Sequence, residues 1–223
     1  MPAPGLIFDF DGVIADSEAL ANTVLADAIS RLGRPSTLDD VLSRYMGKRW
    51  PDVIALIESD TGRAVPDGFS DDLKADILRR FRAELRETPG AGAFIRRFAA
   101  LPHCIASSSS PDRLQVSLAA IGMTDSFGGN VFSAELVERG KPHPDIFLLA
   151  AERIGVAPGH CIVIEDSASG VHAGRAAGMT VIGLSVGSHC RAGHADKLSD
   201  AGAHHSVATW HEVHAIVSRL LGD

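Results

Sequence analysis

Cysteine is scarce in this chain of 223 residues, which has only Cys104, Cys161 and Cys190 and no C-x-x-C pair. So few cysteines exclude a disulfide-rich secreted scaffold. Cys104 and Cys161 lie in short apolar runs, so we expect them to be buried thiols in a reducing compartment. A cytoplasmic location follows as the expectation.

The sequence also lacks long apolar runs and dense clusters of basic residues. No uncharged apolar segment approaches the roughly 18 residues that a membrane span needs, so we expect no membrane contact. Residues 1–11 hold two carboxylates and no basic segment, which opposes a secretory signal. The net charge of −7, from 21 Lys and Arg against 28 Asp and Glu, opposes nucleic-acid binding.

What is present is an ordinary globular composition, with 45% apolar and 22% charged residues, and a length that allows one or two domains. Short apolar runs predict buried strands at residues 5–11, 103–107, 130–133, 160–166 and 180–184, with a weaker one at 203–207. Amphipathic helices are predicted at residues 111–121, 144–154, 167–177 and 210–221. This alternation predicts an α/β fold with a Rossmann-like parallel sheet covered by helices on both faces.

One segment breaks the alternation of strands and helices. From residue 16 to residue 87 the apolar spacing predicts helices only: one through residues 20–32, one at 50–60, and a long one through 73–85 with Ser70 as its cap. We therefore expect an all-α helical cap domain at residues 16–87, inserted into an α/β core formed by residues 1–15 and 88–223. Residues 90–94 are interpreted as the turn by which the chain re-enters the core.

Polar residues follow the predicted strands, at the sheet edge where ligands of open parallel sheets bind. They are Asp9, Asp11, Ser107, Lys141, Glu165 and Asp166. Close carboxylates repel one another unless a cation lies among them, and oxygen ligands without His or Cys favour a hard cation such as Mg²⁺. A serine at a helix start and a lysine can both bind phosphoryl oxygens. The set therefore predicts phosphoryl transfer.

Four segments resemble, in order, the motifs of the haloacid dehalogenase superfamily. They are residues 9–14 (DFDGVI), 105–107 (IAS), 141–147 (KPHPDIF) and 164–167 (IEDS). The resemblance covers almost the whole chain and is to the β-phosphoglucomutase and phosphoglycolate-phosphatase branch, which carries a helical cap. It implies a phosphoric monoester hydrolase that uses Mg²⁺ to hydrolyse a small phosphorylated metabolite, either a sugar phosphate or a short-acid phosphate.

The same resemblance implies a role for each residue. Asp9 attacks phosphorus and forms an aspartyl phosphate, while Asp11 protonates the leaving alcohol and then activates water. Mg²⁺ is held by Asp9, the Asp11 carbonyl group and Asp166, with Glu165 nearby. Dehalogenase members lack the second aspartate, so Asp11 argues against that chemistry.

Simpler interpretations of these residues stay open at this point. Ser107 could be an ordinary loop serine in the run 107–110, and Ser108 or Ser109 could share its role. Lys141 could be a solvated lysine before a proline, and Glu165 with Asp166 could serve only as a helix cap.

Two functions other than a phosphatase stay open. A phosphosugar mutase of the β-phosphoglucomutase type is the alternative enzyme, but the mutases that this chain resembles carry a histidine where Ala21 stands here. A non-catalytic phosphate-responsive binding protein is the third, and the complete set of charged motif residues argues against it.

Secondary candidates lie in the cap and in the histidines. Gly47, Lys48 and Arg49 stand at a helix start, where two cations could reach the remote end of the substrate. His189 and His194 are five residues apart and match no zinc template, so these histidines, and the adjacent pair at 204–205, are expected at the surface or in loops. A monomer and a homodimer are equally compatible with the sequence.

Overall fold

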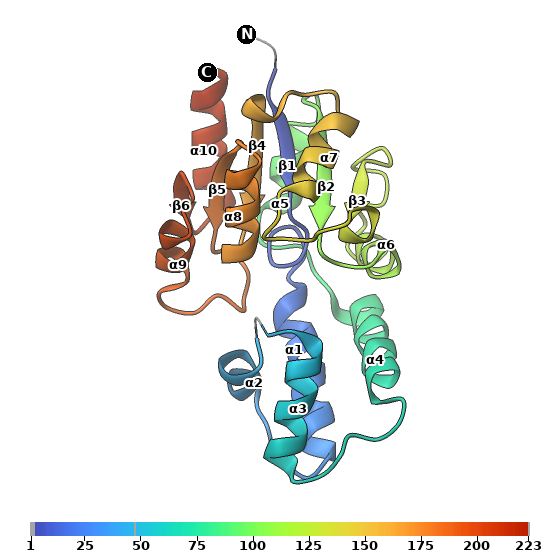
Figure 1. The fold of residues 1–223 in the computed structure, drawn as a ribbon. Helices are drawn as coiled ribbons and strands as arrows, with labels where there is room; N and C mark the ends of the chain where they lie inside the picture. Colours follow the sequence, from blue (N-terminus) through green and yellow to red (C-terminus); the bar gives the residue numbers. More distant parts are fainter. Residues whose placement is uncertain (1–2, 47, 223) are drawn as a thin grey trace.

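The computed structural model describes residues 3–46 and 48–222, and its centre is a sheet of six parallel strands (Figure 1). The strands are β1 (Gly5–Phe8), β2 (His103–Ser107), β3 (Val131–Ser133), β4 (Cys161–Glu165), β5 (Thr180–Leu184) and β6 (His205–Val207). Their order across the sheet is β3-β2-β1-β4-β5-β6, and every neighbouring pair is parallel. The predicted Rossmann-like sheet is therefore confirmed.

Helices cover both faces of this sheet, as the alternating pattern predicts. One face packs against α5 (Ala91–Arg97), α6 (Pro111–Ala120) and α10 (Trp210–Leu221). The other face packs against α7 (Asp145–Arg153), α8 (Ala168–Ala176) and α9 (His194–Asp200). Two short 3-10 turns, Ala134–Leu136 and Pro158–His160, complete the connections. On the first face the Phe8 ring lies 6.1 Å from the rings of both Phe94 and Trp210, so α5 and α10 are fixed against the central strand.

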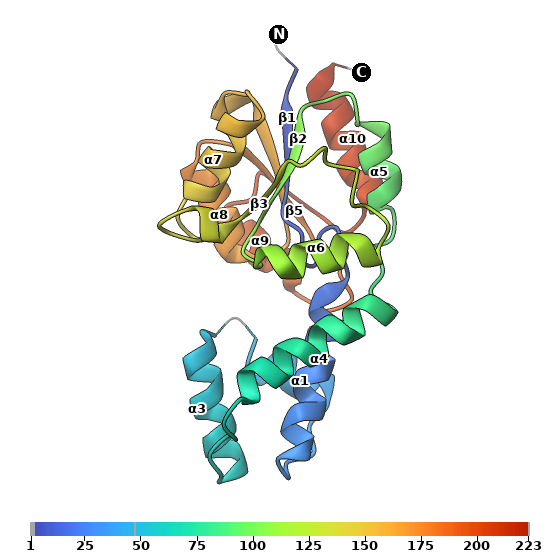
Figure 2. The same cartoon turned by 90° about the vertical axis from the view of Figure 1, so that its right-hand side faces the viewer.

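Four helices lie beyond the carboxyl ends of the strands, apart from the sheet (Figures 1 and 2). They are α1 (Ser17–Arg31), α2 (Leu38–Arg44), α3 (Trp50–Thr61) and α4 (Phe69–Glu84). These helices have an apolar cluster of their own, which includes Ile29, Val41, Ile57 and Leu73. A separate core is what an inserted helical unit needs in order to keep its shape.

The chain crosses between the cap helices and the sheet twice, and the two crossings lie side by side. Asp16 N–H donates to the Arg86 carbonyl oxygen at 3.0 Å, and Thr88 N–H donates to that of Ile14 at 2.8 Å. The Thr88 hydroxyl is buried and accepts a hydrogen bond from Trp210 Nε1 at 2.9 Å. The crossings therefore form a short paired ribbon that is tied to the sheet through α10.

Three predictions about local structure are wrong. Of residues 90–94, only Gly90, at φ 103°, lies in a turn, and residues 91–94 begin helix α5. Ser70 does not cap the long cap helix, which begins at Phe69; its hydroxyl accepts from Trp50 Nε1 at 2.9 Å instead. The first strand ends at Phe8, earlier than predicted. Helices α2 and α9 are additions that the sequence patterns did not indicate.

In the part of the chain that the structure describes, no helix combines the length and the apolar character that crossing a bilayer would demand.

Candidate active site

A cavity of about 680 Å³ lies where the carboxyl ends of the strands face the cap helices. All six polar residues predicted at this edge line it: Asp9, Asp11, Ser107, Lys141, Glu165 and Asp166. Asp9 and Asp11 both face the cavity while Phe10 between them is fully buried, so the side chains alternate as they do along a strand although the strand ends at Phe8.

Three carboxylates form the floor of the site. Asp9, Glu165 and Asp166 are buried, and one oxygen from each lies within 4.8 Å of the other two. Burial raises the pKa of Asp9 well above its ordinary value, and it also raises the pKa of Asp166. Carboxylates that are stripped of water and repel one another are stabilised by a cation. The all-oxygen donor set fits a hard divalent ion.

A buried ammonium group already compensates part of this charge. Lys141 Nζ lies 2.6 Å from Asp9 Oδ1 and 2.6 Å from Glu165 Oε1, and the lysine side chain is only 3% exposed. Burial by itself would lower the pKa of Lys141, but the two carboxylates outweigh it and hold the pKa above its ordinary value. A solvated loop lysine is therefore excluded.

Glu165 has both of its oxygens occupied. Oε1 accepts from Lys141, while Oε2 accepts from Ser167 N–H at 2.8 Å and from the Ser167 hydroxyl at 2.9 Å. The same hydroxyl caps α8 by accepting from Gly170 N–H at 3.0 Å. A Cβ at position 170 would overlap the Glu165 carboxylate, so glycine is required there. These contacts orient Glu165 toward Lys141.

Asp166 lies against Gly12 and contacts two histidines. Gly12 has φ +78°, and a Cβ at this position would overlap the Asp166 carboxylate. Asp166 Oδ2 lies 3.2 Å from His189 Nε2, and its carbonyl oxygen lies 2.6 Å from His194 Nε2. Gly12 therefore allows the loop after β1 to lie close to the loop after β4, which brings Asp9 and Asp166 together.

Asp11 stands in a different environment. Its carboxylate accepts from the hydroxyls of Ser17 and Ser109, both at 2.5 Å, and from Arg113 at 2.7 Å. Burial would raise the pKa of Asp11, but Arg113 and the two hydroxyls together hold it below its ordinary value. In this arrangement the surroundings of Asp11 favour its ionised form, whereas those of Asp9 disfavour it.

Arg113 is a site residue that the sequence analysis missed. It lies on α6, is half-buried, and also approaches Glu18 of α1 at 3.6 Å. Burial and the nearby Asp11 raise the pKa of Glu18. The available signal was a single arginine in the first turn of the helix after the serine run, which alone indicates nothing about Asp11, 102 residues away.

The serines of the run 107–110 occupy different environments. Ser107 is buried and its hydroxyl accepts from Ser109 N–H at 3.1 Å. Ser108 and Ser109 line the cavity, and Ser110 caps α6. The Ser107 hydroxyl thus makes a turn contact within the run, and Ser109 is the serine that contacts Asp11.

The candidate residues of the cap are placed differently from one another. Lys48 lines the cavity. Arg49 has a side chain that is 84% exposed and pairs with Asp52 at 2.9 Å, so it does not face the cavity. Gly47 lies outside the described residues.

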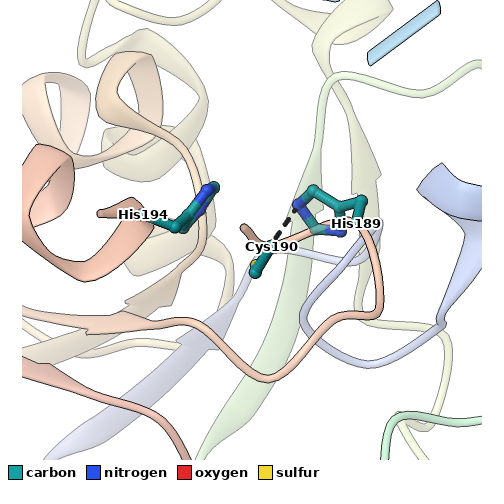
Figure 3. Close-up of side chains that lie close together, drawn as sticks. All are labelled: His189, Cys190 and His194. Atoms are coloured by element: carbon teal, nitrogen blue, oxygen red, sulfur yellow. Dashed lines mark hydrogen bonds between the residues drawn. The ribbon is translucent and has the colours of Figure 1, made fainter. Parts of the chain in front are cut away.

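His189 lies in the loop between β5 and α9, which fits the expectation of surface or loop histidines, but it does not lie at the surface. This side chain is buried, at 3% exposure, against Asp166. His194 lies in the first turn of α9, half-buried, and Cys190 lies between the two histidines (Figure 3). Tertiary contact with Gly12 and Asp166 decides this burial, and the local spacing did not reveal it.

Two curated relatives from Escherichia coli K12 are phosphatases of phosphorylated sugars. Hexitol phosphatase A is 31% identical over 83% of this chain and 85% of that protein. The 6-phosphogluconate phosphatase is 28% identical over 79% of this chain and 80% of that protein.

Two solved structures are similar over nearly their whole length. A haloacid dehalogenase-like protein from Agrobacterium tumefaciens has a TM-score of 0.88 and 32% identity, covering 98% of this chain and 99% of that one. A HAD family hydrolase from Deinococcus radiodurans, solved with bound phosphate and sodium, has a TM-score of 0.85 and 32% identity, covering 98% and 96%. The family model for haloacid dehalogenase-like hydrolases matches residues 4–178. Because this match covers most of the chain, the chain belongs to the haloacid dehalogenase-like hydrolases.

Proposed function

We propose that this hydrolase is a Mg²⁺-dependent phosphatase that cleaves a small phosphate monoester through an aspartyl phosphate on Asp9. The observation that carries the proposal is the position of Asp9, which lies among two further carboxylates and 2.6 Å from the Lys141 ammonium at the strand edge. In this proposal, residues 1–15 and 88–223 form the core domain that carries the catalytic residues, and residues 16–87 form the cap domain that selects the substrate.

Asp9 is the proposed nucleophile. One of its carboxylate oxygens forms a bond to phosphorus as the bond between phosphorus and the ester oxygen breaks. Burial disfavours the negative charge of the ionised Asp9 carboxylate. Asp9 loses that charge when it bonds to phosphorus. Lys141 favours the ionised form of Asp9 before the attack and provides a positive charge for a phosphoryl oxygen during it.

Asp11 is the proposed acid and base. It gives a proton to the leaving alkoxide, then takes a proton from the water that attacks the phosphorus of the aspartyl phosphate, which releases phosphate and restores Asp9. In the arrangement described here, Arg113 favours the ionised form of Asp11. We infer that Arg113 turns from Asp11 toward the substrate when the substrate binds, which frees Asp11 to carry the proton.

Asp9, Asp166 and the Asp11 carbonyl group would hold the Mg²⁺ ion. Bound there, Mg²⁺ supplies charge that neutralises the phosphoryl oxygens in the transition state. Glu165 holds Lys141 in place, since both of its oxygens are already engaged.

The proposed substrate class is a sugar phosphate or a short-acid phosphate. A cavity of about 680 Å³ has room for a molecule of that size. The positive charges of Lys48 and Arg113 on its wall suit an anionic or hydroxyl-rich end remote from phosphorus. The phosphatases of hexitol phosphates and 6-phosphogluconate to which the chain is similar support this class. The free thiols of Cys104 and Cys161 support a reducing compartment, and we place the reaction in the cytoplasm.

Water is the proposed acceptor of the phosphoryl group. All ten histidines of the chain lie between residues 103 and 214, so the cap segment contains none. Ala21 and its neighbour Asn22 line a second cavity, of about 340 Å³, and neither is a base that could activate a sugar hydroxyl for a mutase reaction.

The test is phosphate release by the purified chain from a panel of sugar and short-acid phosphates, with Mg²⁺ and with a chelator. We expect Mg²⁺-dependent release from at least one compound and no conversion to an isomeric phosphate, which NMR of the same reactions would detect. Isomerisation without phosphate release would support a mutase instead. Failure to act on any ester, p-nitrophenyl phosphate included, would support a binding protein.

A further inference from the structure

Three side chains that the proposed phosphatase chemistry does not use gather after β5 and at the start of α9 (Figure 3). Cys190 lies between His189 and His194, and one possible ligand atom from each lies within 4.8 Å of the other two. His189 and His194 also line the large cavity, so an ion can reach them from solvent. The cluster therefore combines two imidazoles and a thiol at an accessible place.

The spacing of the three groups is that of ligands around one small ion. Cys190 Sγ lies 3.6 Å from His189 Nε2. In tetrahedral zinc sites, with Zn–S near 2.3 Å and Zn–N near 2.1 Å, sulfur and nitrogen are about 3.6 Å apart. The rings of His189 and His194 have centroids 5.5 Å apart, and two imidazoles on one zinc ion would have them about 5.3 Å apart by the same geometry. Little movement is needed for all three to bind one ion.

His194 is oriented in the way that metal-binding histidines usually are. Its Nε2 lies 2.6 Å from the carbonyl oxygen of Asp166, so Nε2–H donates to that oxygen and Nδ1 carries the free electron pair. A hydrogen bond from the second ring nitrogen to a carbonyl or carboxylate fixes the tautomer in many metal sites. Nδ1 is therefore the nitrogen of His194 that is available for an ion.

We propose that His189, Cys190 and His194 form a second metal site that binds Zn²⁺, separate from the carboxylate cluster. Two imidazole nitrogens and a thiolate are ligands that zinc prefers, whereas Mg²⁺ prefers oxygen. Binding releases the thiol proton of Cys190 and uses the electron pair on Nε2 of His189, so that nitrogen can no longer donate to Asp166. Water would take the fourth position, because Asp166, although its Oδ2 lies 3.2 Å from the same nitrogen, belongs to the carboxylate cluster.

The experiment is a titration of the full chain with Co²⁺, followed by absorption spectroscopy, with Zn²⁺ as the competitor. We expect one equivalent of Co²⁺ to give the thiolate-to-cobalt charge-transfer band and the intense visible bands of a tetrahedral site, and Zn²⁺ to displace it. Cys190→Ser should abolish the charge-transfer band and weaken Zn²⁺ affinity by more than about 100-fold. Circular dichroism confirms that each variant is folded.

Two matched controls separate this site from its surroundings. Cys104→Ala removes a thiol that is buried in the core, and Asp9→Asn removes an oxygen from the carboxylate cluster; both should keep the charge-transfer band. Co²⁺ binding without a charge-transfer band in the unaltered chain would overturn the proposal without recourse to any variant. A spectrum lost in Asp9→Asn and kept in Cys190→Ser would also overturn it, because the ion would then sit on the carboxylates. None of these readouts depends on phosphatase activity.

Discussion

At the scale of single residues, the site rests on a buried cation between two carboxylates. Lys141 contacts Asp9 and Glu165 at 2.6 Å each, and Phe147 covers the ammonium with its ring centroid 4.8 Å away. Buried charges are costly unless they are paired, and removing one partner leaves the other uncompensated. Lys141 therefore bears on both the stability of the fold and the charge of the proposed nucleophile.

Lys141→Met should lower the free energy of unfolding by about 3–5 kcal/mol and abolish turnover, because Asp9 and Glu165 would be left buried without their cation. Urea denaturation measures the loss of stability. The double variant Lys141→Met with Glu165→Gln should regain part of that stability, because it removes one of the orphaned charges. Equal stability of the single variant and the unaltered chain would show that Lys141 does not compensate the charges of Asp9 and Glu165.

Arg113→Ala should move the alkaline limb of the pH profile of kcat/KM to higher pH. Arg113 lowers the pKa of Asp11, so its removal lets Asp11 keep its proton at higher pH, and the proposed first step needs that proton. Arg139→Ala is the control, since Arg139 forms an exposed pair with Asp145 outside the cavity. An alkaline limb that does not move would show that Asp11 is not the acid.

Much of this residue-scale picture follows from the order of motifs along the chain. Carboxyl ends of parallel strands meet at one edge, so Asp9, Lys141 and Asp166 were predictable as neighbours. The contact between Asp11 and Arg113 was not, because it depends on the rotation of α6 and on where Arg113 points. The burial of His189 depends on Gly12, whose lack of a side chain lets two distant loops approach each other.

At the scale of secondary-structure elements, one aspartate joins the first three cap helices. Asp60 of α3, with a side chain only 7% exposed, accepts from Arg34 at 2.6 Å and from the Tyr45 hydroxyl at 2.5 Å, and it pairs with Arg44. Arg34 lies between α1 and α2, while Arg44 and Tyr45 lie at the end of α2. The hydrogen bond from Arg44 is the largest cause that lowers the pKa of Asp60.

Asp60→Asn should destabilise the chain by about 1–3 kcal/mol at neutral pH, because it removes a charged acceptor from several donors. The pKa of Asp60 is lower in the folded chain than its ordinary value of 3.8, so this stabilisation is present above that value. It is lost as the pH falls through the folded pKa. Thermal unfolding at several pH values should show the gap between the two proteins closing in acid.

Asp52→Asn is the matched control on the same helix. Asp52 pairs with the exposed Arg49, and exposed pairs contribute little. We expect a change within about 0.5 kcal/mol. A loss as large as that of Asp60→Asn would show that charge on α3, and not the buried network, is what stabilises the cap.

The elements that the sequence failed to indicate share a physical feature. α2, α5 and α9 are seven residues each, which is about two turns and too short for a 3.6-residue apolar period to stand out. α2 begins with a capping box formed by Thr37 and Asp40, a local signal that was present in the sequence. Longer elements such as α10, with its exact bounds of Trp210–Leu221, were predictable because their apolar face is continuous.

At the scale of the whole molecule, the chain passes between the cap helices and the sheet through the paired ribbon of residues 14–16 and 86–88, and α4 also packs against α6 of the core. Gly90 packs against Trp210, where a Cβ would lie 3.1 Å from the tryptophan Cβ, so it belongs to the core side of this ribbon. We therefore place the hinge of cap closure in the ribbon itself. Closure would carry Lys48 over the substrate and exclude water from the carboxylates.

Lys48→Ala should lower kcat/KM on the sugar or short-acid phosphate found by screening. The corresponding loss of transition-state stabilisation should be about 1–3 kcal/mol, the usual contribution of a hydrogen bond from a charged group. Hydrolysis of p-nitrophenyl phosphate should change far less, because this ester has no polar end for Lys48 to bind. Arg49→Ala, one residue along the same loop but facing solvent, should leave both rates unchanged. An equal loss on both esters would mean that Lys48 supports closure in general and does not select the substrate.

The most direct measurement is to trap the phosphorylated enzyme by borohydride reduction, which converts an aspartyl phosphate to homoserine, and to locate that residue by mass spectrometry. Asp11→Ala with p-nitrophenyl phosphate and Mg²⁺ is the suitable system. The nitrophenolate leaves without a proton, while attack by water is slowed once its base is missing. We expect a burst of about one equivalent of nitrophenol and homoserine at position 9. A burst that leaves Asp9 unmodified, or homoserine at another position, would contradict it.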